Sequence, residues 1–319
     1  MIEIAGLTKR FGPITAVAGI DLNVDKGEVL GFLGPNGAGK STTMKMVAGF
    51  LAPDGGYARI CGHDIETDTL AAQRRIGYLP EGAPAYPDMT PRQFLKFIAQ
   101  VRGFDGAAAK SAIGDAVGKT ELDPVLDQPI DTLSKGFKRR VGLAQAILHD
   151  PPVLIMDEPT DGLDPNQKHA VRRLIQGMAR EKAIVISTHL LEEVEAVCTR
   201  AVIIDRGRIV ADGTPAQLLA RSRHHNAVTI VLPSGQAAAV AAKLKGLPEV
   251  AGVEQSTSNG SAAVTAYPKG GALLIEDVSA MAAREHWDVK ELYAEAGRLD
   301  EVFRAVTTHD AAWARESRT

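Results

Sequence analysis

Residues 34–42 read Gly-Pro-Asn-Gly-Ala-Gly-Lys-Ser-Thr and fit G-x-x-x-x-G-K-S/T, the pattern of a phosphate-binding P-loop. The glycines allow backbone N–H groups to turn inward around phosphate oxygens. Lys40 supplies a positive charge for the β- and γ-phosphates, and Ser41 supplies a hydroxyl for Mg²⁺. This stretch therefore predicts a site for a nucleoside triphosphate.

The segments on either side of the loop fit a strand and a helix. Residues 28–33 (Glu-Val-Leu-Gly-Phe-Leu) form an apolar run typical of a buried strand, and residues 41–48 read as the start of a helix. A strand, a loop and a helix in this order place the phosphates at a helix N-terminus, where the helix dipole favours anions. This context favours a phosphate site over a chance glycine-rich turn.

Composition limits the class of protein. The chain has 319 residues, 45% hydrophobic and 24% charged, with a net charge of -3. These values fit a globular protein of one or two domains and give no reason to expect a nucleic-acid ligand. The isolated Cys61 and Cys198 indicate neither a disulfide framework nor a zinc site, and they favour a reducing compartment. Without a secretory signal or a long apolar run, we expect a cytoplasmic protein that reaches a membrane through a partner.

Strand-like and helix-like runs alternate up to residue 220, which predicts an α/β P-loop NTPase core. Residues 153–156 and 183–187 are short apolar runs that suit strands covered on both faces of a parallel sheet. Residues 2–33 contain alternating segments and a Gly-Pro turn, and they predict an antiparallel β subdomain. Residues 82–148 are mainly helical and predict an insert in the core.

A second, smaller domain is predicted after the core. Residues 221–226 (Arg-Ser-Arg-His-His-Asn) read as a polar linker. Residues 227–308 give the order strand, helix, strand, strand, helix, strand, which predicts an α+β accessory domain of ferredoxin-like type. Within it, Asn259-Gly260 is the signal of a type I′ hairpin turn, and residues 309–319 form a tail.

One predicted strand ends in two acidic residues. Residues 153–158 (Val-Leu-Ile-Met-Asp-Glu) deliver Asp157 and Glu158 to the carboxyl end of a strand, where the sites of α/β proteins lie. Asp157 is placed to hold Mg²⁺, and Glu158 is placed to take a proton from an attacking water. The alternative is a strand that ends in a solvated acidic turn, and the preceding P-loop argues against it.

A second anion site is indicated between these motifs. Leu133–Phe137, called the signature segment below, precedes a helical run, and a Ser-x-Gly at a helix N-terminus can bind an anion. An ordinary helix cap is the alternative. One nucleotide cannot easily use both phosphate-binding segments of a small core. Two chains placed head to tail could hold each nucleotide between the P-loop of one and the signature segment of the other.

Five segments together resemble the nucleotide-binding subunit of an ABC transporter: Gly34–Thr42, Leu133–Phe137, Val153–Glu158, Gly162-Leu163-Asp164 and His189. The resemblance covers roughly residues 2–220, and the signature segment makes it more specific than a P-loop alone. It is strongest to bacterial drug-, gliding- and lipid-export ATPases. Those proteins often carry Ser-Lys-Gly in the signature and a small domain after the motor.

The resemblance implies nucleotide contacts within one chain. An aromatic residue, Phe11, would stack on adenine unless it belongs to the core. The remaining contacts fall on Val17, Gly34, Asn36, Gly37, Ala38, Gly39, Lys40, Ser41 and Thr42. Ser134 and Gly136 would contact the γ-phosphate held by the partner chain. Asp164 falls in the loop that crosses the dimer interface.

The resemblance also implies the residues that act in ATP hydrolysis. Catalysis falls on Lys40, Glu158 and His189, and His189 would link the γ-phosphate to Glu158. The Mg²⁺ ligands are Ser41, Glu81 and Asp157.

Two positions depart from the family pattern. Glu81 stands where the family usually has Gln, at a position that touches Mg²⁺ and water. A carboxylate still coordinates Mg²⁺, so we expect altered metal dependence rather than loss of activity. Lys135 replaces a signature glycine and Phe137 a common Gln, whereas Gly136 is kept. We expect function to survive these changes.

The predicted function is an ATP-hydrolysing motor subunit that drives a separate membrane permease, with export as the expected direction. The resemblance implies a second copy of the ATP-binding chain and a position at the inner face of the cell membrane. In the family, residues 81–103 form a groove for a permease helix, which Pro84, Tyr86, Pro87 and Phe94 would line unless they are core residues. The alternative is a soluble ABC-type ATPase in iron–sulfur assembly, or a regulatory or maturation factor without transport.

Overall fold

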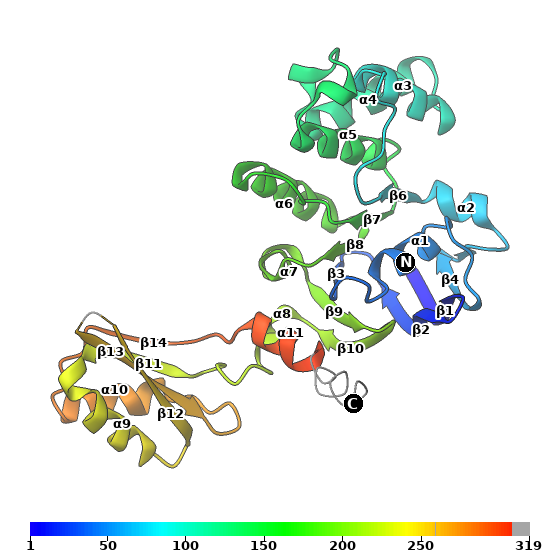
Figure 1. The fold of residues 1–319 in the computed structure, drawn as a ribbon. Helices are drawn as coiled ribbons and strands as arrows, with labels where there is room; N and C mark the ends of the chain where they lie inside the picture. Colours follow the sequence, from blue (N-terminus) through cyan, green and yellow to red (C-terminus); the bar gives the residue numbers. More distant parts are fainter. Residues whose placement is uncertain (259, 308–319) are drawn as a thin grey trace. The chain divides into compact units, whose positions relative to one another are not determined.

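The chain divides into two compact units in the computed structural model, which describes residues 1–258 and 260–307 (Figure 1). The first unit spans Met1–Pro215 and the second begins at Ala216. The predicted division at residue 220 is close to this one and stays a prediction.

A six-stranded sheet forms the centre of the first unit. Its strand order is β10-β9-β3-β8-β7-β6, and every neighbouring pair is parallel except β9 and β10. The bounds are β3 Val29–Leu33, β6 Ile76–Leu79, β7 Val153–Asp157, β8 Ala183–Thr188, β9 Arg200–Asp205 and β10 Arg208–Gly213. All residues of β3, β7 and β8 are buried, as expected for continuous apolar runs in a sheet covered on both faces.

A second sheet of the first unit is antiparallel. It has the order β2-β1-β4-β5, with β1 Ile2–Phe11, β2 Ile14–Val24, β4 Gly55–Ile60 and β5 His63–Asp64. Side chains of both sheets join one hydrophobic core, for example Ile4 of β1 and Phe32 of β3. The predicted antiparallel subdomain before the P-loop is confirmed.

Helices occupy the connections between the strands. Their bounds are α1 Lys40–Val47, α2 Thr69–Arg74, α3 Pro91–Val101, α4 Gly106–Thr120, α5 Lys135–Ile147, α6 Pro165–Ala179 and α7 Leu191–Val197, with short 3-10 turns at Asp123–Val125 and Ile130–Thr132. In the sequence, α3, α4 and α5 come between β6 and β7, and Figure 1 shows them gathered in one helical part. This part is the predicted helical insert.

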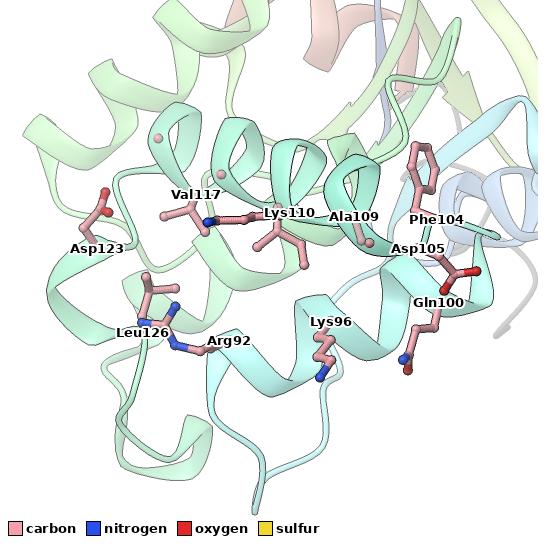
Figure 2. Close-up of a pocket in the computed structure, with 14 residues that line it drawn as sticks. Arg92, Lys96, Gln100, Phe104, Asp105, Ala109, Lys110, Val117, Asp123 and Leu126 are labelled. Atoms are coloured by element: carbon pink, nitrogen blue, oxygen red, sulfur yellow. The ribbon is translucent and has the colours of Figure 1, made fainter.

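A groove of about 580 Å³ lies between α3 and α4 of the helical insert (Figure 2). Its lining combines apolar side chains such as Val117 and Leu126 with the lysines Lys96 and Lys110. None of its lining residues belongs to the P-loop or to the acidic end of β7. It is therefore separate from the nucleotide site described below.

The second unit is built on a four-stranded antiparallel sheet of order β12-β13-β11-β14. Its elements follow in the predicted order, with bounds β11 Val228–Pro233, a 3-10 turn at Ser234–Gln236, α9 Ala237–Lys245, β12 Val250–Ser258, β13 Ser261–Pro268, α10 Ile275–Arg284 and β14 Glu291–Ala294. A short α8 (Pro215–Leu219) precedes them and α11 (Leu299–Thr307) follows them. Ser258 pairs with Ser261, so the hairpin is present. Asn259 and the predicted tail lie outside the described residues.

Candidate nucleotide site

Three neighbouring parallel strands bring the predicted catalytic segments to one edge of the sheet. β3 runs into the P-loop, β7 ends at Asp157, and β8 ends just before His189. β8 pairs with both β3 and β7, and all three strands point the same way. Their carboxyl ends therefore meet at the same edge (Figure 1), where sites of open α/β sheets form.

The P-loop turns into α1 at a glycine that no other residue can replace without strain. Gly39 has φ 107° and is the N-cap of α1. A Cβ added at Gly39 would lie 2.4 Å from the carbonyl oxygen of Ala16. The loop thus needs glycine both for its left-handed backbone and for its close approach to β2. The first N–H groups of α1 remain available for an anion.

The ammonium of Lys40 is held inside the loop. Lys40 is 7% exposed, and its Nζ donates to the carbonyls of Gly34 at 2.7 Å and Pro35 at 3.1 Å. Burial lowers the pKa of Lys40, because it removes water from the charged form. The negative charges of Glu158, Asp157 and Glu81 act on this pKa in the opposite direction. Negative phosphate oxygens would be stronger acceptors for this ammonium than the two neutral carbonyls.

Asp157 has one carboxylate oxygen that the protein leaves unused. The residue is 1% exposed, and Ser187 donates its hydroxyl to Oδ1. Oδ2 is buried and has no hydrogen-bond partner. A buried carboxylate oxygen without a partner is costly unless a cation or water satisfies it. Together with the half-buried hydroxyl of Ser41, this oxygen fits the hard oxygen ligands that Mg²⁺ prefers.

Glu158 and His189 form a pair beside the P-loop edge. Oε1 of Glu158 lies 3.0 Å from Nδ1 of His189. Glu158 has φ 50°, a left-handed backbone that is strained for a residue with a side chain. Its N–H donates to the carbonyl of Ser187 at 3.0 Å. The strand end therefore holds a carboxylate in a fixed place with a histidine at hydrogen-bond distance.

Two residues beside this edge escaped the sequence reasoning. Arg139 of α5 is buried and donates to the carbonyls of Pro80 and Glu158. The hydroxyl of Tyr78 on β6 is buried without a partner, and burial together with the charges of Asp157 and Glu81 raises the pKa of Tyr78 to about 12. In the sequence, Arg139 belonged to a basic first turn of a helix. Arg139 follows Gly136 by three residues, which places both on the same face of α5, and both are buried. This spacing is the signal that could have identified it.

The signature segment and the Asp164 segment lie side by side, at the starts of two helices. Ser134 is the N-cap of α5 and accepts from the N–H of Phe137 at 3.3 Å. Asp164 is the N-cap of α6 and accepts from the N–H of Gln167 at 2.9 Å. A Cβ at Gly136 would lie 2.4 Å from Oε1 of Gln167. Ser134 and Asp164 are exposed, and Figure 1 shows α5 in the helical insert and α1 against the sheets.

The remaining predicted residues differ in their exposure. Phe11, at the end of β1, is 49% exposed, with Nζ of Lys9 5.9 Å from its ring centre. Val17 is fully buried in the core of the two sheets. Glu81 is exposed in the loop after β6. Asn36 and Gly37 are exposed in the P-loop, Thr42 is half-buried, and Ala38 is buried. The nucleotide and metal roles of all these residues stay predictions.

Comparisons with known proteins agree with this architecture. A family model described as ABC transporter matches residues 17–161. Nod factor export ATP-binding protein I of Paraburkholderia xenovorans (strain LB400) is 40% identical over 220 residues, which cover 69% of this chain and 72% of that protein. The daunorubicin/doxorubicin resistance ATP-binding protein DrrA of Streptomyces peucetius is 34% identical over 314 residues, which cover 97% of this chain and 93% of that protein.

A solved structure of the ATP binding subunit of an ABC transporter has a TM-score of 0.64 with this chain at 30% identity, covering 68% of this chain and 91% of that one. This chain belongs to the ABC transporter family and is one of its ATP-binding subunits, with ATPase activity. The resemblance seen in the sequence is confirmed. Within the part of the chain that the structure describes, no helix is both long enough and apolar enough to span a bilayer.

Proposed function

We propose that this chain is the motor of an exporter: two copies close head to tail on ATP and drive a separate membrane permease. One observation supports this proposal most directly. Lys40, Asp157, Glu158 and His189 meet at one sheet edge, whereas Ser134 is exposed at the start of a helix of the insert. One chain therefore offers two separate halves of a phosphate site, and a second copy placed head to tail would complete each half.

The chain's own residues divide the work of hydrolysis. The P-loop N–H groups and Lys40 hold the β- and γ-phosphates. Glu158 orients a water and accepts its proton, and His189 lies at hydrogen-bond distance from the Glu158 carboxylate and would link it to the γ-phosphate. Ser41 and Asp157, with Glu81 nearby, would hold Mg²⁺. When bound, this ion would offset the negative charge on the phosphate oxygens.

Closure would depend on the γ-phosphate. In the closed dimer this group lies between Lys40 of one chain and Ser134 of the partner. Once hydrolysis separates it, that bridge is lost and the chains part. The free energy available to the permease is the difference between the free energies with which the open and the closed dimer bind ATP.

An exposed aromatic cluster supports a permease contact on the helical insert. Tyr86 is 53% exposed, and its ring lies 5.7 Å from that of the exposed Phe97. The ring of Phe94 lies 6.2 Å from that of Tyr86 but is buried, so Phe94 is a core residue that supports the cluster from beneath. Tyr86 and Phe97 are among the large hydrophobic side chains that remain exposed. Aromatic side chains of this kind are enriched at interfaces. The cluster supports peripheral binding at the inner face of the membrane, tested by co-purification with an integral membrane protein from detergent.

The relatives support export as the direction. One is a Nod factor export protein and another is a daunorubicin/doxorubicin resistance protein, and the alignment with the latter covers both units of this chain. An accessory unit after the motor is thus shared over almost the full length. The substrate is selected by the permease in this scheme.

The decisive experiment is Glu158→Gln. Without a base, the variant should bind ATP, fail to hydrolyse it, and accumulate as a dimer. Light scattering in saturating ATP measures this state, and Glu195→Gln, an exposed residue of α7, is the charge-matched control that should remain active. A Glu158→Gln chain that stays monomeric in saturating ATP would refute the closure model.

A further inference from the structure

A buried arginine ties together three segments that lie far apart in the sequence. Arg139 is 5% exposed. Its Nη1 donates to the carbonyl of Pro80 at 3.3 Å, and its Nη2 donates to the carbonyl of Glu158. Pro80 directly precedes Glu81, and Arg139 lies just over one helical turn after Ser134. One side chain therefore connects the signature helix α5, the Glu81 loop and the backbone of the candidate base.

The contact falls on a peptide whose conformation needs support. The left-handed φ of Glu158 is unfavourable for an L-residue, so neighbouring groups must hold it. Its N–H is held by Ser187, and its carbonyl also accepts from the N–H of Asp161 at 3.1 Å. Arg139 adds a charge-assisted hydrogen bond to the same carbonyl. The direction of the Glu158 carboxylate thus depends on where α5 lies.

The guanidinium also brings a positive charge into an acidic surrounding. Burial lowers the pKa of Arg139, while the negative charges of Asp161, Glu158, Asp157 and Glu81 raise it. Arginine remains protonated at neutral pH even when buried. Its positive charge therefore attracts the carboxylates at this edge and adds to the contacts that hold the Glu158 segment against α5.

We propose that Arg139 is a positioning residue for hydrolysis, which sets the backbone of Glu158 according to the position of the signature helix. The inference rests on the proposed head-to-tail dimer. In that dimer Ser134 touches the nucleotide of the partner, whereas Glu158 acts on the nucleotide of its own chain. Arg139 therefore connects the segment that contacts one ATP with the residue that acts in hydrolysis of the other.

The test compares three substitutions on the same helix. Arg139→Gln should lower kcat about 10- to 100-fold, because a misplaced carboxylate loses its geometry with water, and it should change KM for ATP less than about threefold. Arg140→Gln is the matched control, since Arg140 pairs with Glu121, the residue after α4, at 2.9 Å and donates to neither carbonyl.

Arg139→Lys separates positioning from folding. It keeps the charge but cannot reach both carbonyls with a rigid fork, so kcat should stay reduced while KM for ATP stays close to that of the wild type. Wild-type kcat in Arg139→Lys, or equal kcat in Arg139→Gln and Arg140→Gln, would overturn the proposal.

Dimer closure is measured separately. Glu158→Gln and the double variant Glu158→Gln with Arg139→Gln are compared by light scattering in saturating ATP. We expect both to dimerise, because Arg139 acts on hydrolysis after closure. If Glu158→Gln alone stays monomeric, the proposed dimer is wrong and with it the link between two sites. If only the double variant stays monomeric, Arg139 acts on closure and its assignment to Glu158 is wrong.

Discussion

The catalytic edge and the signature segment are built in opposite ways within one chain. At the edge, Lys40 and Asp157 are almost fully buried and each already has a protein partner. In the signature segment, Ser134 is exposed, and its side chain caps its own helix. The side chains at the sheet edge are therefore held in place by contacts within one chain, whereas the signature segment has the form of a surface that a partner completes.

The substitution Ser134→Asp is the strongest test of whether the signature segment is completed by a partner. Aspartate caps a helix as well as serine, so the stability of α5 should be kept. Its negative charge would face the γ-phosphate of the partner chain, and closure should fail. We expect the ATPase rate to fall about 100-fold, roughly 2.7 kcal/mol in the barrier, while ATP binding to the monomer is unchanged. Steady-state hydrolysis and ATP titration of the monomer measure the two effects.

Ser134→Asn is the control for that experiment, because it preserves the cap without adding a charge. It should retain clearly more activity than Ser134→Asp. Equal loss in both variants, or full activity in Ser134→Asp, would show that the segment acts only as a helix cap.

A smaller effect is expected from Glu81→Gln, which concerns the catalytic edge. Glu81 is exposed after β6 and adds a negative charge beside Lys40 and Glu158. Removing that charge should weaken the affinity for the activating metal by a few-fold, about 1 kcal/mol, and change the ratio of Mg²⁺ to Mn²⁺ activation. Titrations of the ATPase rate with each metal provide the measurement. Superimposable curves for variant and wild type would remove Glu81 from the metal site.

The smallest effect on activity is expected at His149, which lies two residues past the end of α5 and contacts none of the predicted site residues. His149 is half-buried, and because a carbonyl only accepts, its Nε2–H donates to Ile76 at 3.1 Å. Burial, followed by the charge of Arg102, lowers the pKa of His149 to about 4. The unfolded chain has a histidine pKa near 6.5, so stability is full above about pH 6.5 and falls as the pH drops towards 4.

Between pH 7.5 and 5 this histidine should cost the first unit about 1–2 kcal/mol of unfolding free energy. His149→Gln should flatten that part of the dependence and leave the ATPase rate at pH 7.5 within about twofold. Urea unfolding at the two pH values is the measurement, and His169→Gln, an exposed residue of α6, is the control. An unchanged pH dependence in His149→Gln would contradict the assignment.

Much of the fold was predictable because its signals are local. The all-apolar runs of β3, β7 and β8 identify strands covered on both faces, and the P-loop pattern identifies the turn between β3 and α1. In the second unit, alternation and turn residues gave the order of strands and helices. Such periodicities are carried by neighbouring residues, so they can be read without knowing what packs against them.

Local patterns alone indicated which side chains gather at this sheet edge: the lysine of the P-loop, and two carboxylates and a histidine at strand ends. Three contacts became visible only in the folded chain. Arg139 donates to the carbonyls of Pro80 and Glu158. Gly136 lies against Gln167, and one oxygen of Asp157 is left without a partner. These contacts join residues from separate elements. Whether these contacts form depends on strand order and helix packing, which no local pattern encodes. Their free energy is set by burial and by the distance between the groups, and not by the spacing of the residues along the chain.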